Sequence, residues 1–135
     1  PRLGSASSRW QNIYLSNQPN VSSDVRQKSL IQDIPKDLIS ELKEVNPKMY
    51  KQGTQWHFGY MAQDIERAIY KYALNKVGFK QAKNYVKEFA VLHKSESYMS
   101  LLYGEIAVLK EEETRKEIER LEDRIARLER LVYEK

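Results

Sequence analysis

A regular spacing of apolar residues near the end of the chain constrains its fold more than any other feature. After Lys110, apolar side chains recur at alternating intervals of three and four residues, at Ile118, Leu121, Ile125, Leu128 and Val132. This repeat places them on one face of a helix, as the seam of a coiled coil requires. The seam has no other apolar surface to bury against, which predicts that copies of the chain associate. Two heptads are marginal for a coiled coil, so the rest of the protein has to help hold the assembly together.

A second apolar stripe lies earlier in the same predicted helix, at Leu102, Ile106 and Leu109. Leu109 precedes Ile118 by nine residues, which puts the two stripes about half a turn out of phase at roughly 100° per residue. We therefore predict one long helix whose first part packs on a globular domain and whose second part packs on copies of itself. Arg124 and Glu129 fall at flanking positions that can pair between chains.

The middle of the chain predicts a small α+β domain that is mainly helical. "IPKDLISELKEVNP" reads as a helix with Pro35 in its first turn, and "AQDIERAIYKYALNKVG" as an amphipathic helix that stops at Gly78. Helical spacing places apolar residues on one face of the first helix, Ile34, Leu38, Ile39, Leu42 and Val45, and on the inward face of the second, Ile65, Ala68, Ile69 and Tyr72. "KMYKQGTQWHFGYMAQ" between them predicts a β-hairpin around "QGTQ". Residues 79–100 are compatible with a helix or with a second hairpin.

Three predicted segments follow: an extended segment at 1–22, a globular domain at 23–110 and a coiled-coil helix at 111–135. The first is rich in Ser, Asn, Gln and Pro, and its apolar island around Trp10, Ile13 and Leu15 needs partners to become buried.

The composition disfavours several classes of function. Cysteine is absent and only two histidines occur, which removes disulfide and thiolate–metal chemistry and makes a metal site or other cofactor unexpected. No apolar run is long enough to cross a membrane. The net charge is +4, and residues 110–130 carry seven basic and eight acidic side chains, so no basic stripe for nucleic acid emerges.

The stretch "NVSSDVRQKS" at residues 20–29 holds the candidate chemistry, because Ser23 precedes Lys28 by five residues. A serine hydroxyl becomes a useful nucleophile when a base lies within hydrogen-bond reach, and a neutral lysine amine is such a base. The simpler interpretation is helix capping, with Asp24 as N-cap and Gln27 completing a capping box. A helix that starts at Asp24 would place Lys28 in its second turn, and its free N–H groups beside Ser23 would favour an oxyanion. Arg26 would add positive charge that disfavours a protonated Lys28.

Four segments together resemble one family. "LGSASSRWQNIYLSN", "SSDVRQK", "WHFGYMAQDIE" and "YGEIAVL", followed by the terminal coiled coil, are similar to the C-terminal intramolecular chaperone domain of bacteriophage tailspikes and tail fibres, of the self-cleaving Ser/Lys type. A related module occurs in myelin regulatory factor. Residues 74–98 depart from the pattern of that family.

The resemblance implies a homotrimer that helps the preceding fibre or spike stem of the same chain to fold, and then cuts the chain and is released. It implies action in the host cytoplasm during virion assembly, with the mature stem in the virion tail, and no cofactor, nucleic acid or membrane. Residues 1–22 are then the end of the stem.

The resemblance also implies the roles of individual residues. Ser23 is the nucleophile, Lys28 its general base and Ser22–Ser23 the scissile bond, while Asp24 and His57 are supporting residues. Ser22 is a rival nucleophile, with a spacing of six residues to Lys28. A non-cleaving trimerisation or attachment module of a viral fibre is the alternative function. Ile and Leu at alternating seam positions favour two strands in isolated peptides, whereas the resemblance implies three.

Overall fold

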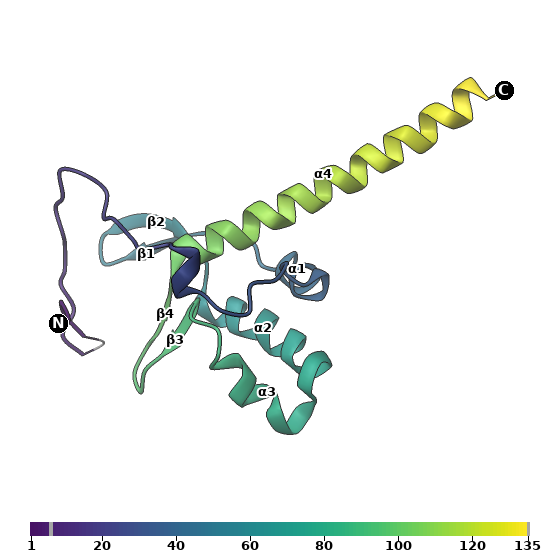
Figure 1. The fold of residues 1–135 in the computed structure, drawn as a ribbon. Helices are drawn as coiled ribbons and strands as arrows, with labels where there is room; N and C mark the ends of the chain where they lie inside the picture. The colour runs from purple at the N-terminus through teal and green to yellow at the C-terminus, as the bar shows by residue number, and fades with distance from the viewer. Residues whose placement is uncertain (6, 135) are drawn as a thin grey trace. The chain divides into compact units, whose positions relative to one another are not determined.

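The computed structural model describes residues 1–5 and 7–134 of the chain. They divide into two compact units, Pro1–Asp33 and Ile34–Lys135, which we describe separately. The elements in chain order are η1 Val25–Gln27, α1 Lys36–Leu42, β1 Lys48–Gln52, β2 Gln55–Gly59, α2 Ala62–Val77, α3 Phe79–Val86, β3 Leu92–Lys94, β4 Met99–Leu101 and α4 Tyr103–Tyr133 (Figure 1). The predicted α+β, mainly helical class with short hairpins and a long last helix is confirmed.

The first unit consists of extended chain and one short turn of 3-10 helix, η1. Trp10, Ile13 and Leu15 are each at least 60% exposed, so this unit does not bury the apolar island by itself. The helix predicted from Asp24 is wrong in length. Its apolar residues Val25 and Leu30 are 63% and 92% exposed, and a short helix without tertiary packing does not persist beyond a turn in water.

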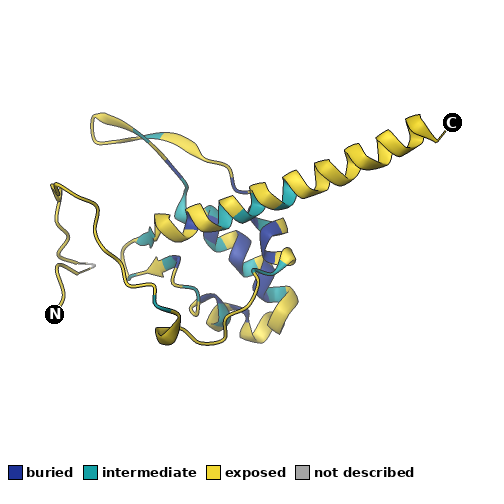
Figure 2. Ribbon diagram, turned by 45° about the horizontal axis from the view of Figure 1, so that its top comes forward, coloured by how far each residue is buried: buried dark blue, intermediate teal, exposed yellow. Residues whose placement is uncertain are grey.

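The second unit has a core made by α1, α2, α3 and the start of α4 (Figure 2). Its fully buried large side chains are Leu42, Ile65 and Ile69, and the helical spacing of apolar residues had predicted all three on inward faces. Pro35 lies one residue before α1, at its N-cap, rather than in its first turn. Gly78 ends α2 with a φ of 82°, a conformation that glycine adopts without strain.

The two hairpins are antiparallel. In the first, β1 and β2 pair from Lys48 opposite Gly59 to Gln52 opposite Gln55, which confirms the hairpin predicted around "QGTQ". Residues 79–100 contain both of the alternatives that the sequence left open, since α3 comes first and the β3–β4 hairpin follows.

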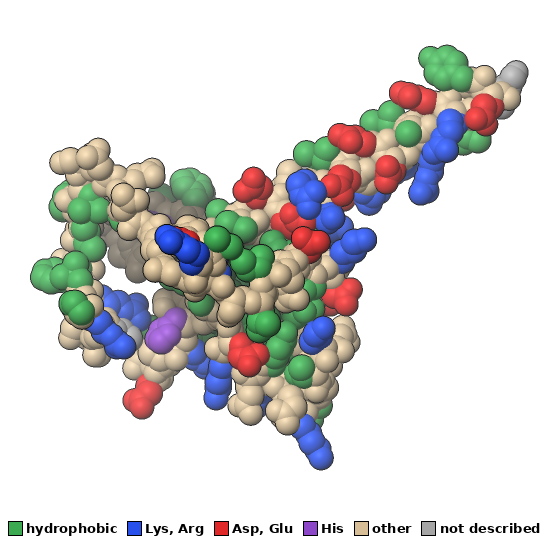
Figure 3. Space-filling model, in the orientation of Figure 1, with side chains coloured by type: hydrophobic (Ala, Val, Ile, Leu, Met, Phe, Trp, Pro, Cys, Tyr) green, Lys and Arg blue, Asp and Glu red, His purple; other side chains and the backbone are tan. Residues whose placement is uncertain are grey.

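Helix α4 has a packed part and an exposed part, as its two stripes predicted, except that Leu102 lies at the N-cap before the helix and is 49% exposed. Ile106 is buried and Leu109 packs at the edge of the core. Beyond them the seam residues are between 42% and 70% exposed: Ile118, Leu121, Ile125, Leu128 and Val132. Figure 3 shows acidic and basic side chains along this part of α4, with hydrophobic ones between them.

A lysine clip holds α4 against α1. The Lys110 Nζ donates hydrogen bonds to the carbonyl oxygens of Leu42, at 2.9 Å, and Val45, at 2.7 Å, and to Glu113 Oε2 at 2.8 Å. It also lies over the ring of Tyr60, 5.6 Å from the centroid. All three ammonium donors are used. The Leu42 carbonyl also accepts from the Val45 backbone N–H at 3.0 Å, so Lys110 adds a second hydrogen bond there and also bonds to the Val45 carbonyl just past the end of α1.

Replacing Lys110 with methionine should destabilise the second unit by about 1.5–3 kcal/mol, because three hydrogen bonds from a charged group are lost, among them the one to the Val45 carbonyl. Urea unfolding followed by circular dichroism measures this effect. Lys116→Met is the matched control: Lys116 makes only helix-surface ion pairs with Glu112 and Glu119, which typically contribute about 0–1 kcal/mol. Equal losses for the two variants would show that the clip does not anchor α4.

The start of α4 is fixed by a tyrosine. The Tyr60 backbone N–H donates to the Tyr103 hydroxyl at 3.0 Å, and this hydroxyl donates to the Tyr60 carbonyl oxygen at 3.2 Å. Gly59 lies against the same hydroxyl, and a Cβ at that position would collide with it. The glycine of the "HFG" stretch is therefore explained by close packing of β2 on α4.

Candidate active site at Ser23 and Lys28

Ser23 and Lys28 lie together in the first unit. The Lys28 Nζ donates a hydrogen bond to the Ser23 Oγ at 2.8 Å. The route differs from the one that the sequence suggested, because Lys28 is not in a second helical turn. It follows η1 in an extended conformation, with φ −113° and ψ 148°. The turn Val25–Gln27 reverses the chain enough for side chains five residues apart to meet.

The neighbouring serine has a different partner. The Ser22 Oγ donates to Gln27 Oε1 at 2.6 Å. An amide oxygen accepts a hydrogen bond but does not take up a proton near neutral pH, whereas a neutral lysine amine does. Of the two adjacent hydroxyls, only that of Ser23 is therefore bonded to a group that can act as a base.

Asp24 and Arg26 hold the turn between them. The Asp24 Oδ1 accepts from the Arg26 backbone N–H at 2.9 Å, so Asp24 is the N-cap that the sequence predicted. The Arg26 Nη2 donates to Asp24 Oδ2 at 2.6 Å. The side-chain hydrogen bond from Arg26 lowers the pKa of Asp24 below its usual value. Asp24 thus stays an anion, and keeps its cap, until the pH falls below the ordinary range of aspartate.

Two expectations about this turn need correction. Gln27 does not complete a capping box, since its side chain is bonded to Ser22. The expected oxyanion donors are also reduced, because the backbone N–H groups of Arg26, Gln27 and Lys28 already bond to Asp24 Oδ1, the Asp24 carbonyl and the Val25 carbonyl. The Arg26 guanidinium, paired with Asp24, does not supply the uncompensated positive charge that the sequence suggested near Lys28.

Comparison with known proteins shows that part of this chain is similar to a known family and to a phage protein. Residues 23–74 match the family model for the chaperone of endosialidase, and the match begins at Ser23. This segment of the chain is similar to that family. Depolymerase 1, capsule K3-specific, from Klebsiella phage KP32 is 35% identical over 82 residues, which cover 54% of this chain and 9% of that protein. The resemblance to the chaperone domain of phage tailspikes is confirmed.

The matched segment contains Ser23, Asp24, Lys28 and His57, whereas the seam residues of α4 lie after it. His57 belongs to the second unit, on β2, where its ring stacks on that of Tyr50 with centroids 5.8 Å apart. Its supporting role beside the serine and lysine stays a prediction. Sequence reasoning missed Gln27 as a partner of Ser22, although an offset of five residues, the same as between Ser23 and Lys28, could have indicated it.

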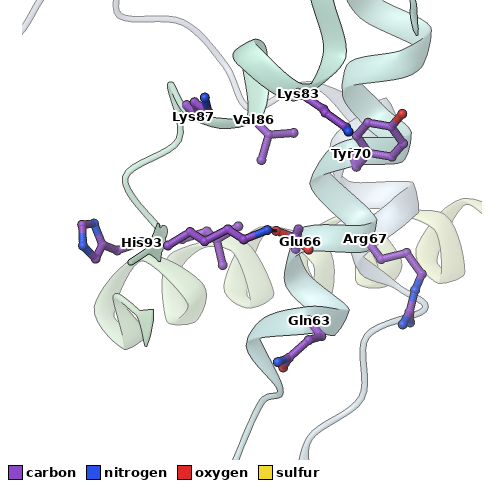
Figure 4. Close-up of a pocket in the computed structure, with 10 residues that line it drawn as sticks. Gln63, Glu66, Arg67, Tyr70, Lys83, Val86, Lys87 and His93 are labelled. Atoms are coloured by element: carbon purple, nitrogen blue, oxygen red, sulfur yellow. Dashed lines mark hydrogen bonds and ion pairs between the residues drawn. The ribbon is translucent and has the colours of Figure 1, made fainter. Parts of the chain in front are cut away.

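The second unit also has a hollow between α2, α3 and β3, with a volume of about 810 Å³. Two of its lining residues form an ion pair, with the Lys94 Nζ 3.5 Å from Glu66 Oε2, while His93 points away from the other labelled residues (Figure 4). Its lining holds no serine, and its single carboxylate is already paired. This hollow therefore offers neither a nucleophile with a base nor a pair of catalytic carboxylates.

Within the described residues no group of three or more His, Cys, Asp or Glu side chains is arranged to hold a metal ion. Among the helices of that same part of the chain, none is both long and apolar enough to cross a membrane.

Proposed function

We propose that this chain is an intramolecular chaperone that trimerises, assists the folding of a preceding phage spike or fibre stem, and then releases itself by cutting the Ser22–Ser23 bond. The observation that carries the proposal is the 2.8 Å hydrogen bond between Lys28 Nζ and Ser23 Oγ, in a segment where the family match begins at Ser23. The protein is then a single-turnover serine endopeptidase with one substrate bond, its own.

The cleavage chemistry follows from the position of the nucleophile. A neutral Lys28 takes the hydroxyl proton of Ser23 as its Oγ attacks the carbonyl carbon of Ser22. The C–N bond breaks as Lys28 returns the proton to the Ser23 nitrogen, which leaves the Ser22 acyl group on Ser23 Oγ as an ester. Water hydrolyses this ester, giving a carboxylate on Ser22 and restoring the Ser23 hydroxyl. No separate substrate pocket is needed, because nucleophile and scissile bond belong to adjacent residues.

Lys28 must be neutral for this chemistry, and both members of the pair are exposed in the single chain. Burial disfavours a charged amine. We infer that assembly of three chains, or docking of the stem, covers the pair and favours the neutral amine. Cutting then follows assembly rather than preceding it.

The exposed seam on α4 supports trimerisation, because its apolar side chains lie on a part of the helix that does not pack on the core of the same chain. Joining three chain ends raises the effective concentration of the stems for one another. This helps because pairing between distant parts of β-rich chains is slow and exposed to aggregation. Cleavage afterwards removes the chaperone, so that the stem is held by its unfolding barrier.

The relative from phage KP32 is a capsule-specific depolymerase by name. We infer that the stem preceding this domain is a phage spike of the same general kind, that folding occurs in the host cytoplasm, and that the mature stem is incorporated into the virion tail.

Substitution of the two serines tests the proposal. Ser23→Ala should leave the chain whole, because no hydroxyl remains beside Lys28. Ser22→Ala is the matched control and should still separate residues 1–22 from residues 23–135 once the reaction is complete. Intact mass spectrometry distinguishes these outcomes. Cleavage of Ser23→Ala would overturn the nucleophile assignment, and a wild-type chain that trimerises but stays whole would establish the non-cleaving attachment module instead.

A further inference from the structure

We propose that Gln27 is a positioning residue for cleavage, which holds Ser22, the residue carrying the scissile carbonyl, while Lys28 holds the nucleophile. The inference rests on the proposed self-cleavage and adds a residue that neither the serine–lysine pair nor the capping chemistry accounts for.

Two side-chain hydrogen bonds flank the scissile peptide. Ser22 Oγ donates to Gln27 Oε1 at 2.6 Å, and Lys28 Nζ donates to Ser23 Oγ at 2.8 Å. Both have an offset of five residues and both cross the turn Val25–Gln27. The two residues of the scissile bond are thus tied, one each, to two consecutive residues on the far side of the same turn.

This arrangement bears on the approach of the reacting atoms. The Ser23 Oγ reaches the Ser22 carbonyl carbon through a five-membered ring made by Oγ, Cβ, Cα, N and that carbon. The peptide itself is planar, so φ and χ1 of Ser23 decide whether the hydroxyl faces the carbonyl carbon. Rotation about φ of Ser23 swings Ser22 relative to the turn, so the bond from Ser22 to Gln27 restrains it. Lys28 restrains the side chain on the Ser23 side. Gln27 restrains the residue on the Ser22 side, and with both bonds made fewer rotations have to be frozen on the way to attack.

The hydrogen bond between Ser22 and Gln27 is not expected to stabilise the fold. Ser22 and Gln27 are both exposed, and an exposed side-chain bond contributes little to folding because water replaces it when it breaks. Gln27 is also no alternative base, since its amide does not titrate. Its contribution is therefore expected in the rate of cleavage and not in the stability of the fold or in the pH at which Lys28 acts.

Gln27→Met tests this role, because methionine keeps the length of the side chain and removes the accepting oxygen. In a cell-free translation time course of the full chain, cleavage should be about 10- to 100-fold slower than in the wild type, the range expected for a misplaced reacting group. The shape of the pH profile should stay the same. Gln27→Glu restores an acceptor at the same reach and should restore most of the rate. Gln32→Met, which changes an exposed glutamine of the same unit, should cut at the wild-type rate.

A double-mutant cycle completes the test. Ser22→Ala removes the same hydrogen bond from its other end, so Ser22→Ala with Gln27→Met should be no slower than the slower single variant. Wild-type cleavage by Gln27→Met, no recovery in Gln27→Glu, or multiplicative losses in the double variant would each overturn the role of Gln27. Failure of the proposed function is a separate result: it shows as an uncut wild type, or as Ser23→Ala cut like the wild type.

Discussion

Replacing Lys28 with methionine is expected to slow cleavage at Ser22–Ser23 by about 10²- to 10⁴-fold, the usual contribution of a positioned general base. The substitution removes the amine that lies 2.8 Å from Ser23 Oγ and leaves an apolar chain of similar length. Because Lys28 is exposed, the change should not disturb packing, so the loss reports on chemistry. Lys36→Met, at an exposed lysine where α1 begins, is the matched control and should cut normally. Normal cleavage by Lys28→Met would show that Lys28 is not the general base.

The pH dependence of the wild-type cleavage rate is a second test of Lys28 as the general base. Only the neutral amine accepts the Ser23 proton, so the rate should rise with pH between 5 and 10. Asp24 does not shape this profile. Its pKa is lowered by Arg26, so it contributes its cap as an anion throughout that range and loses it only in more acidic solution. A rate that is constant from pH 5 to 10 would contradict a lysine base.

Ile125→Glu is expected to convert the assembled protein largely to monomer, with association weakened by at least about 10³-fold, since an unpaired buried charge costs several kcal/mol. Ile125 lies at the middle of the seam and is 54% exposed in the single chain. Each added carboxylate would therefore be buried among those of the other copies. Ala126→Glu makes the same charge change one position away from the seam and should leave assembly intact. Light-scattering mass of the two variants provides the comparison.

The outcomes of this comparison are distinct. If the Ile125→Glu protein keeps the mass of the wild-type assembly, then the globular domain and the stem, and not α4, hold the copies together. A wild-type mass of two chains would show that the alternating Ile and Leu of the seam select two strands, as they do in isolated peptides. Truncation after Leu109 is a poorer test, because it also deletes Lys110 and with it the clip to Leu42 and Val45.

Helical spacing predicted the core of the second unit well because burial in a helix repeats along the sequence. Ile65 and Ile69 are four residues apart and both buried, and the phase change between Ile106 and Ile118 separated the packed part of α4 from its free part. The hairpin around Gly53 could be predicted because its turn residues are local.

Other features could not be read from the sequence. Lys110 bonds to the Val45 carbonyl across 65 residues, and no local pattern encodes such a contact. Gln27 matched a capping box, but a polar side chain at a helix end can bond to several nearby groups. Here Ser22 competes for it, and because little burial supports η1, the longer helix is not formed.

The contact between Ser23 and Lys28 was therefore predicted, but its geometry was not, and its catalytic role stays a prediction. Ser23 and Lys28 do meet, by way of a single 3-10 turn and an extended Lys28 in place of a continuous helix. The discrimination between Ser22 and Ser23 came from the identity of their partners, which spacing alone did not give.

Hydroxylamine trapping tests the central claim most directly. The proposed route passes through an ester between the Ser22 acyl group and Ser23 Oγ, and hydroxylamine attacks esters far faster than amides. When the wild-type chain cuts itself in hydroxylamine, the mass of the fragment 1–22 should show a hydroxamate at Ser22, and the other fragment should begin with the free amine of Ser23. A Ser22 that carries only a carboxylate at every hydroxylamine concentration, or a cut at any other bond, would contradict attack by Ser23.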